Sequence, residues 1–276
     1  YGEASRSISH SENVYVVGQG AGARMASVKL ATTGQPGPTS HPSHLRLEEN
    51  RFAATMRLTD PEEDYWFWGM FNAANYCQDL AKSCRLQEFS LVVLAPAATG
   101  TATLSVQLRG NSSLAASPDH QVSVTLNGTP IGNGIWDGLT DLRLALPVAA
   151  SLLREGSNQV RVEAQLPSSA AYNYFYLDRF DLDYPRRNQA SQDQLVLTGP
   201  PGQRLTASGF TSSAIQVFDL GDPGRPKTVT GAQIQATPGG YQVSLVPTSA
   251  ATPYLLVADG AVHVPTQIRP MESTGL

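Results

Sequence analysis

The chain has 276 residues, of which 15% are charged and 41% hydrophobic, and its formal net charge is −4. This length allows one large domain or two smaller ones. The slight negative charge, with no basic stripe in the sequence, argues against nucleic acid as a partner. No stretch approaches the ~18 apolar residues that a membrane-spanning helix needs. The 24 glycines and 19 prolines, among short runs of Val, Thr and Ser, favour a β-rich extracellular protein with many turns.

Residues 1–43 differ from the rest of the chain in their predicted secondary structure. Asn13–Val17 predicts one short strand, and residues 32–43, TTGQPGPTSHPS, predict a loop or linker. Between residues 44 and 187, short alternating segments recur at fairly regular intervals with almost no helical pattern. About nine such strands separated by turns predict a β-sandwich.

A break between two units is expected at residues 184–194, YPRRNQASQDQ, where Pro185 would end the last strand of the first sandwich. Residues 188–268 carry several more short strands and predict a second, smaller β-sandwich. A domain this small is close to the lower limit for burying a core alone. We therefore expect it to pack against its neighbour.

The ends of the sequence lack the signals that usually open and close a domain. The chain begins with Tyr1, shows no signal peptide, and carries no secondary-structure pattern in residues 265–276. We therefore expect a piece of a longer protein. Residues 269–276 would then be a truncated linker to a following domain.

The stretch at residues 120–138, HQVSVTLNGTPIGNGIWDG, predicts a β-hairpin. Every second residue from 122 to 126 is apolar, which is typical of a half-buried strand. Asn127-Gly128 follows, and both residue types accept the positive φ angles of a tight hairpin turn. Trp136 lies at the far end, among glycines. Its ring could either pack the end of the sandwich or contact a ligand at the surface.

Cys77 and Cys84 are seven positions apart in NYCQDLAKSC. This spacing does not fit the CxxC patterns of redox or zinc sites. The simplest interpretation is a disulfide that closes a short loop in an oxidising compartment, and the alternative is a pair of free buried thiols. No His or Asn pattern accompanies either residue, so a catalytic cysteine is not expected.

Several phrases, taken in order, resemble one family. They are NVYVVGQGAGARM, HLRLEENRF, DYWFWGMF, PDHQVSVTLNGTPIGNGIWDG, LLREGSNQVRVE, NYFYLDRFDLDYPRR and ASGF…IQVFDLGDPGRP. Together they resemble the region just upstream of the catalytic domain in gingipain-like cysteine peptidases and related secreted bacterial proteins. The resemblance covers most of residues 10–270. It implies a galactose-binding-like jelly-roll, then a small β-sandwich, then a peptidase domain beyond this chain.

The family's catalytic dyad is a His and a Cys in the peptidase domain, and neither motif is present here. The histidines lie outside any recognisable catalytic phrase, and no GxSxG motif exists. The adjacent acidic residues Glu48-Glu49 and Glu62–Asp64 are interpreted as solvated turns, because neighbours on a strand point to opposite faces. We therefore expect no catalytic residue in this chain. The five histidines are His10, His41, His44, His120 and His263.

Two kinds of binding site stay open. Asp178, Asp181 and Asp183 could contribute to a structural calcium ion, although such a site needs about six to eight oxygens from several loops. No other cofactor or metal is expected. Jelly-rolls of the type that the resemblance implies often hold sugars on exposed aromatic rings. Strand aromatics more often belong to cores, which is the interpretation for Trp66 and Trp68. The speculative ligand contacts are Trp136, Tyr172 and Tyr174.

The sequence thus predicts an accessory region without catalytic activity, in a larger secreted or cell-surface peptidase. Its main partner would be the peptidase domain expected C-terminal to it, which it would scaffold or cover. The alternative is a carbohydrate-binding module that targets the parent protein to a surface polysaccharide. An exposed aromatic platform would favour this alternative.

Overall fold

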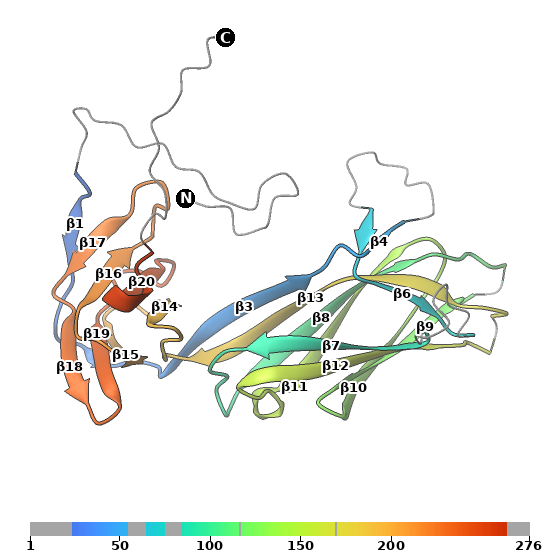
Figure 1. Ribbon diagram of the computed structural model, residues 1–276, viewed down its shortest axis with the longest axis horizontal. Helices are drawn as coiled ribbons and strands as arrows, with labels where there is room; N and C mark the ends of the chain where they lie inside the picture. Colours follow the sequence, from blue (N-terminus) through green and yellow to red (C-terminus); the bar gives the residue numbers. More distant parts are fainter. Residues whose placement is uncertain (1–23, 55–64, 75–83, 116, 169, 264–276) are drawn as a thin grey trace, which may run out of the picture.

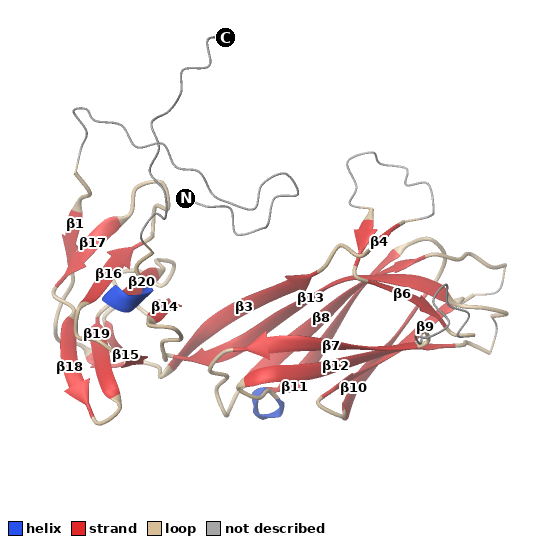
Figure 2. Ribbon diagram, viewed as in Figure 1, coloured by secondary structure: helices blue, strands red, loops and turns tan. Residues whose placement is uncertain are grey.

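The computed structural model describes residues 24–54, 65–74, 84–115, 117–168 and 170–263, and these residues fold almost entirely as strands (Figure 2). Two sandwiches follow one another along the molecule. They are joined where β3 (Ser40–Glu48) and β13 (Tyr174–Arg187) reach the smaller one (Figure 1). The predicted all-β fold, a jelly-roll sandwich followed by a smaller β-sandwich, is confirmed.

The larger sandwich has two sheets, with strand orders β10-β9-β12-β7 and β11-β8-β13-β3, and β6 also pairs with β13. All these pairs are antiparallel. A two-stranded ribbon of β4 and β5 is separate from both sheets. The elements besides β3 and β13 are β4 (Phe52–Ala53), β5 (Trp66–Phe67), β6 (Gly69–Asn72), β7 (Leu86–Val93), β8 (Thr101–Gly110), β9 (His120–Leu126), β10 (Thr129–Trp136), β11 (Asp141–Ala149), the 3-10 helix η1 (Ala150–Leu152) and β12 (Gly156–Gln165).

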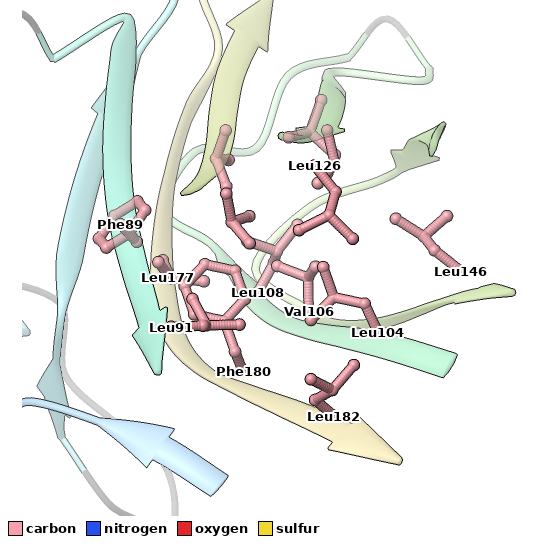
Figure 3. Packing of buried hydrophobic residues seen from close by; sticks show 14 of the residues in the cluster. Phe89, Leu91, Leu104, Val106, Leu108, Leu126, Leu146, Leu177, Phe180 and Leu182 are labelled. Carbon is pink, nitrogen blue, oxygen red and sulfur yellow. The ribbon is translucent and has the colours of Figure 1, made fainter. Parts of the chain in front are cut away.

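Alternate side chains of the strands point inward and fill the space between these two sheets. Every second residue of β8 from Ala102 to Leu108 is at most 2% exposed. These side chains meet Phe180 and Leu182 of β13 and apolar residues of the opposite sheet, as the close view in Figure 3 shows. Because complete burial of one such side chain contributes about 1.5–3 kcal/mol, this cluster is the main source of the sandwich's stability.

The smaller sandwich has sheets of strand order β1-β17-β16-β20-β14 and β18-β19-β15-β2. Its core includes Phe210, Tyr254 and Leu256, which are all fully buried. Its elements are β1 (Ser27–Lys29), β2 (Gln35–Pro36), β14 (Gln194–Leu197), β15 (Gln203–Phe210), β16 (Ile215–Asp219), β17 (Lys227–Thr230), β18 (Gln233–Thr237), β19 (Gly240–Leu245), β20 (Tyr254–Ala258) and the 3-10 helix η2 (Asp259–Ala261).

The segment before residue 43 differs from the predicted linker. β1 pairs in parallel with β17, β2 pairs in parallel with β15, and Leu30 between them lies in the core of the smaller sandwich at 2% exposure. The smaller sandwich therefore takes strands from both sides of the larger one in sequence. Local composition gave no sign of this, because the partners of β1 and β2 lie far along the chain. The strand expected at Asn13–Val17 and the linker expected at 269–276 lie outside the described residues.

The prediction that Pro185 ends a strand is wrong, because β13 continues to Arg187. Pro185 lies opposite Pro42 of β3, and its carbonyl accepts a hydrogen bond of 2.8 Å from Ala97 on its other side. The two prolines thus face each other at a pair that exchanges no backbone hydrogen bonds. At such a position the proline nitrogen points away from β3, so its missing N–H group removes no hydrogen bond from the β3–β13 ladder.

The hairpin of β9 and β10 is confirmed, and its turn has φ angles of 50° at Asn127 and 83° at Gly128. The Asn127 side chain also has a second role, which the sequence did not indicate. Its Nδ2 donates to Leu152 O and to Asn158 Oδ1, both at 2.8 Å, and its Oδ1 accepts from Gln159 N at 2.9 Å. Asn127 therefore ties the hairpin to η1 and β12.

Two substitutions separate these roles. Asn127→Gly keeps the positive φ and loses the side-chain bonds, so it should lower the free energy of unfolding by about 1–2 kcal/mol. Asn127→Asp keeps the shape but turns a carboxylate oxygen toward the acceptors on Leu152 and Asn158, so we expect a larger loss. Urea unfolding of the two variants gives the comparison. If both variants were as stable as the wild type, the side-chain bonds of Asn127 would contribute little.

Candidate functional site

A group of buried polar and aromatic side chains lies at the end of the larger sandwich that is far from the smaller one. We call Asp119, His120, Trp136 and Asn173 the tip cluster. His120 begins β9, Trp136 ends β10, and the two lie opposite each other in the hairpin. Asp119, His120 and Asn173 are completely buried and Trp136 is 8% exposed. Hairpin pairing therefore brings His120 and Trp136 together, and Asn173 joins them from the segment before β13.

His120 uses both of its ring nitrogens. Nδ1 lies 2.8 Å from Asn173 Oδ1, and Nε2 lies 3.0 Å from Gly138 O and 3.1 Å from Ser112 O. The Nδ2 of Asn173 donates to the carbonyls of residues 121 and 165 at 2.9 and 2.7 Å, which turns its Oδ1 toward the ring. His120 is therefore a fully hydrogen-bonded structural residue with no nitrogen available for general base catalysis.

Asp119 accepts hydrogen bonds from the backbone of the two neighbouring loops, at Leu114 and Gly138. Its two oxygens accept hydrogen bonds from Gly138 N and Leu114 N, both at 2.9 Å, and Oδ1 lies 3.3 Å from His120 Nε2. Burial raises the pKa of this carboxyl group, but the two N–H groups and His120 outweigh burial, so the pKa lies below its usual value. The carboxylate stays ionised, and its stabilising effect is lost only as the pH falls from the unfolded value through the lowered folded one.

Trp136 packs as a core residue. Its ring stacks on His120 at 4.6 Å between centroids, with 24° between the planes, and meets Phe175 edge-on at 5.3 Å. Both partners cover the ring, so it presents no open face to a sugar. The indole Nε1 is buried and has no hydrogen-bond partner within the described part of the chain. Packing, not hydrogen bonding, therefore holds Trp136 in place.

The other aromatic candidates divide between surface and core. Tyr172 is 38% exposed, and its ring lies 5.4 Å from that of the half-buried Tyr174 at an angle of 54°. The two rings are thus adjacent but do not form a flat platform. Trp68 is buried as predicted, whereas Trp66 is 38% exposed. The core interpretation of Trp66 is wrong because β5 turns Phe67, which is 5% exposed, toward the core and Trp66 to the opposite face.

The acidic residues of β13 pair with basic side chains. Asp181 Oδ1 accepts a hydrogen bond of 2.8 Å from Arg46, and Asp183 Oδ1 lies 2.8 Å from His44 Nδ1. Burial raises the pKa of Asp181, but Arg46 and Arg179 outweigh it and hold that pKa below its usual value. Among the described residues no group of three or more His, Cys, Asp or Glu side chains could hold a metal ion.

No arrangement for nucleophilic catalysis is found in the described ranges. His41, His44 and His120 make their side-chain bonds to Asn188, Asp183 and Asn173. A catalytic histidine would instead contact a serine or cysteine side chain. His10 lies outside the described residues. The described part of the chain also contains no helix long and apolar enough to cross a membrane.

Cys77 lies outside the described residues, so its pairing with Cys84 stays a prediction. Cys84 is 5% exposed, and no cysteine in the described residues is a free thiol. We expect mass spectrometry of the non-reduced protein to find the two residues joined, and reduction to lower the free energy of unfolding by about 2–3 kcal/mol, because the bond closes a short loop. Two alkylatable thiols in protein from an oxidising medium would contradict the disulfide.

Comparisons with known proteins bear on this architecture. No family model and no curated protein matches the sequence. Among solved structures, the dimeric latent PorU of Porphyromonas gingivalis is similar with a TM-score of 0.62 and 8% sequence identity. The match covers 88% of this chain and 22% of the PorU chain. At this identity the likeness shows the fold alone, and the chain spans about a fifth of PorU's length.

Two further structures match with much lower scores. The VP2 subviral particle of infectious bursal disease virus has a TM-score of 0.28 at 12% identity, and the match covers 78% of this chain and 40% of the VP2 chain. An FMN-binding β-glucuronidase of Facaelibacterium prausnitzii also has a TM-score of 0.28, at 15% identity, with 80% of this chain and 34% of its own covered. Likeness at this level carries no argument about function.

Proposed function

We propose that this chain is a non-catalytic accessory region of a larger secreted gingipain-like cysteine peptidase, and that it scaffolds or covers the peptidase domain. The observation that carries the proposal is the match of 88% of the chain to a segment that makes up 22% of PorU. A unit with this fold therefore occurs within a much longer polypeptide. The phrases that resemble the region upstream of gingipain-like catalytic domains point in the same direction.

The side chains support a scaffold. The polar groups that usually supply chemistry are used in holding the structure: Asp119 and His120 bind loops of the tip, and Asp181 binds Arg46. Both sandwiches have their own buried cores. A secreted or cell-surface location is part of the proposal and rests on the resemblance to gingipain-like proteins. The principal partner would be the peptidase domain C-terminal to this chain.

The test compares the natural full-length protein with a version that lacks this chain. We expect the purified chain alone to cleave no Arg- or Lys-peptide substrate. We also expect the peptidase part without it to unfold at a lower temperature and to resist proteolysis less well. Identical stability and activity with and without the chain would overturn the scaffold role, as would a full-length protein that contains no Cys/His peptidase domain.

The second candidate is a carbohydrate-binding module, and the exposure of Tyr172 beside Tyr174 is the observation in its favour. A glycan array of the purified chain tests it. Binding that is lost in Tyr172→Ala, while the urea midpoint stays the same, would support this function and demote the first. We expect no such binding under the accessory-region proposal.

A further inference from the structure

The two sandwiches are joined by two chain segments, not by one. We call residues 38–41 and 187–190 together the junction. The β3–β13 ladder runs to its last pair, Ser40 opposite Arg187, and Asn188 N then donates to Thr39 O at 2.9 Å. On the other side, Ser208 N donates to Asn188 O at 3.0 Å. A hydrogen-bonded double strand thus runs from one sandwich into the other (Figure 1).

One pair of side chains fastens these two segments to each other. His41 Nδ1 lies 2.9 Å from Asn188 Oδ1, and Asn188 Nδ2 donates to Pro38 O at 2.9 Å. Because the amide nitrogen is used by Pro38, the oxygen faces the ring, and Nδ1 of His41 is the donor. Both side chains are buried, each residue being 5% exposed. This clasp joins positions that are 147 residues apart in sequence.

The surroundings of His41 disfavour a positive charge. Arg186 is its direct neighbour across the β3–β13 ladder. His44, the next histidine of β3, is bound to Asp183, and Glu155 is bound by Arg187, so neither carboxylate pairs with His41. The smaller sandwich meets the junction through the backbone of Ser208, which bonds Asn188 and Ala190, and the carbonyl of Arg204 bonds the adjoining Gly37. Protonation at Nε2 would thus leave the Nδ1 hydrogen bond to Asn188 in place but would make His41 a buried cation beside a second cation.

The pKa of His41 agrees with this geometry. Burial has the largest effect and lowers the pKa of His41 below its ordinary value of 6.5. The hydrogen bond to Asn188 raises this pKa, whereas the charge of Arg186 lowers it, and the pKa stays below the ordinary value. A group with a lowered folded pKa stabilises the closed form fully above its ordinary pKa. That stability decreases as the pH falls through the range between the ordinary and the lowered value.

We propose that the junction is a proton-sensitive clasp: neutral His41 holds the two sandwiches in a fixed orientation, and its protonation in mildly acidic solution releases them while each remains folded. The sandwiches themselves stay intact in that range. Asp119 and Asp181 keep their charge at least down to the ordinary aspartate pKa of 3.8, because their own pKa values are lowered. The clasp would thus make the position of one sandwich relative to the other depend on pH.

Hydrogen exchange of the whole chain between pH 8 and pH 5 tests the clasp, after correction for intrinsic exchange rates. The amides of Asn188 and Ser208 should keep their protection above the ordinary histidine pKa. Below the ordinary histidine pKa, the protection of these amides should fall by at most about tenfold per pH unit, because one proton is taken up on opening. Core amides such as that of Val106 should not change. Small-angle scattering should show a wider distribution of dimensions over the same range.

Two variants decide which group is responsible. In His41→Gln a neutral amide replaces the ring, so exchange at Asn188 should no longer depend on pH. In His44→Gln, the matched control on the same strand, the response should persist. A wild-type junction whose protection is constant down to pH 5 would overturn the proposal, and so would a response that survives in His41→Gln or disappears in His44→Gln.

Discussion

Trp136→Ala should lower the free energy of unfolding of the larger sandwich by about 3–5 kcal/mol, the usual cost of removing a buried tryptophan. The ring is 8% exposed and is covered by His120 and Phe175, so its removal leaves a cavity that these rings cannot fill. Trp136→Phe should cost about 1–2 kcal/mol, because the indole N–H has no partner among the described residues and little beyond volume is lost. Urea unfolding followed by circular dichroism measures both changes.

Tyr172→Ala is the matched control, because this aromatic residue lies at the same tip but is 38% exposed. Its effect should stay within about 0.5 kcal/mol, as is usual for surface positions. An unchanged urea midpoint in Trp136→Ala would show that the ring is not part of the core. If glycan binding were also lost in that variant, Trp136 would return as a ligand contact.

Local pattern was enough to predict the β9–β10 hairpin of the larger sandwich. The alternation of residues 122–126 and the pair Asn127-Gly128 predicted β9, its turn and the start of β10, since both signals depend only on neighbours in sequence. Counting back from the turn also places His120 within one residue of Trp136. The exact pairing could not be counted, because the ladder shifts between Pro130 and Gly132.

Features that depend on distant partners were not predictable in this way. Pro, Gly and Ser in residues 32–43 are typical of a loop, but pairing with β15 makes a strand of Gln35–Pro36. Pro185 is typical of a strand end, but its backbone groups point away from β3, so the β3–β13 ladder continues past it to Arg187. The interpretation of Trp136 stayed open for the same reason. Its direct neighbours in sequence, Ile135 and Asp137, do not cover it, and the rings that do come from β9 and β13.

The interior of the tip cluster is where a single polar substitution should have its largest effect. Asn173→Ala should lower the free energy of unfolding by roughly 1–3 kcal/mol, because it leaves the buried His120 Nδ1 without its acceptor. The carbonyls of Gln121 and Gln165 each lose one hydrogen bond as well, although these residues still pair with each other in the β9–β12 ladder. Asn133→Ala, an exposed asparagine of β10, is the control and should have almost no effect.

Urea unfolding of Asn173→Ala and of the isosteric Asn173→Asp separates hydrogen bonding from shape. Asn173→Asp retains the acceptor toward His120 but places oxygen against the two carbonyls, so it should also be strongly destabilised. Stability close to wild type in both variants would show that solvent reaches the cluster and satisfies these groups. With the expected losses, opening the tip is costly. A ligand at this end would then have to bind the outer surface around Tyr172, because the interior that holds Trp136 and His120 is not accessible to it.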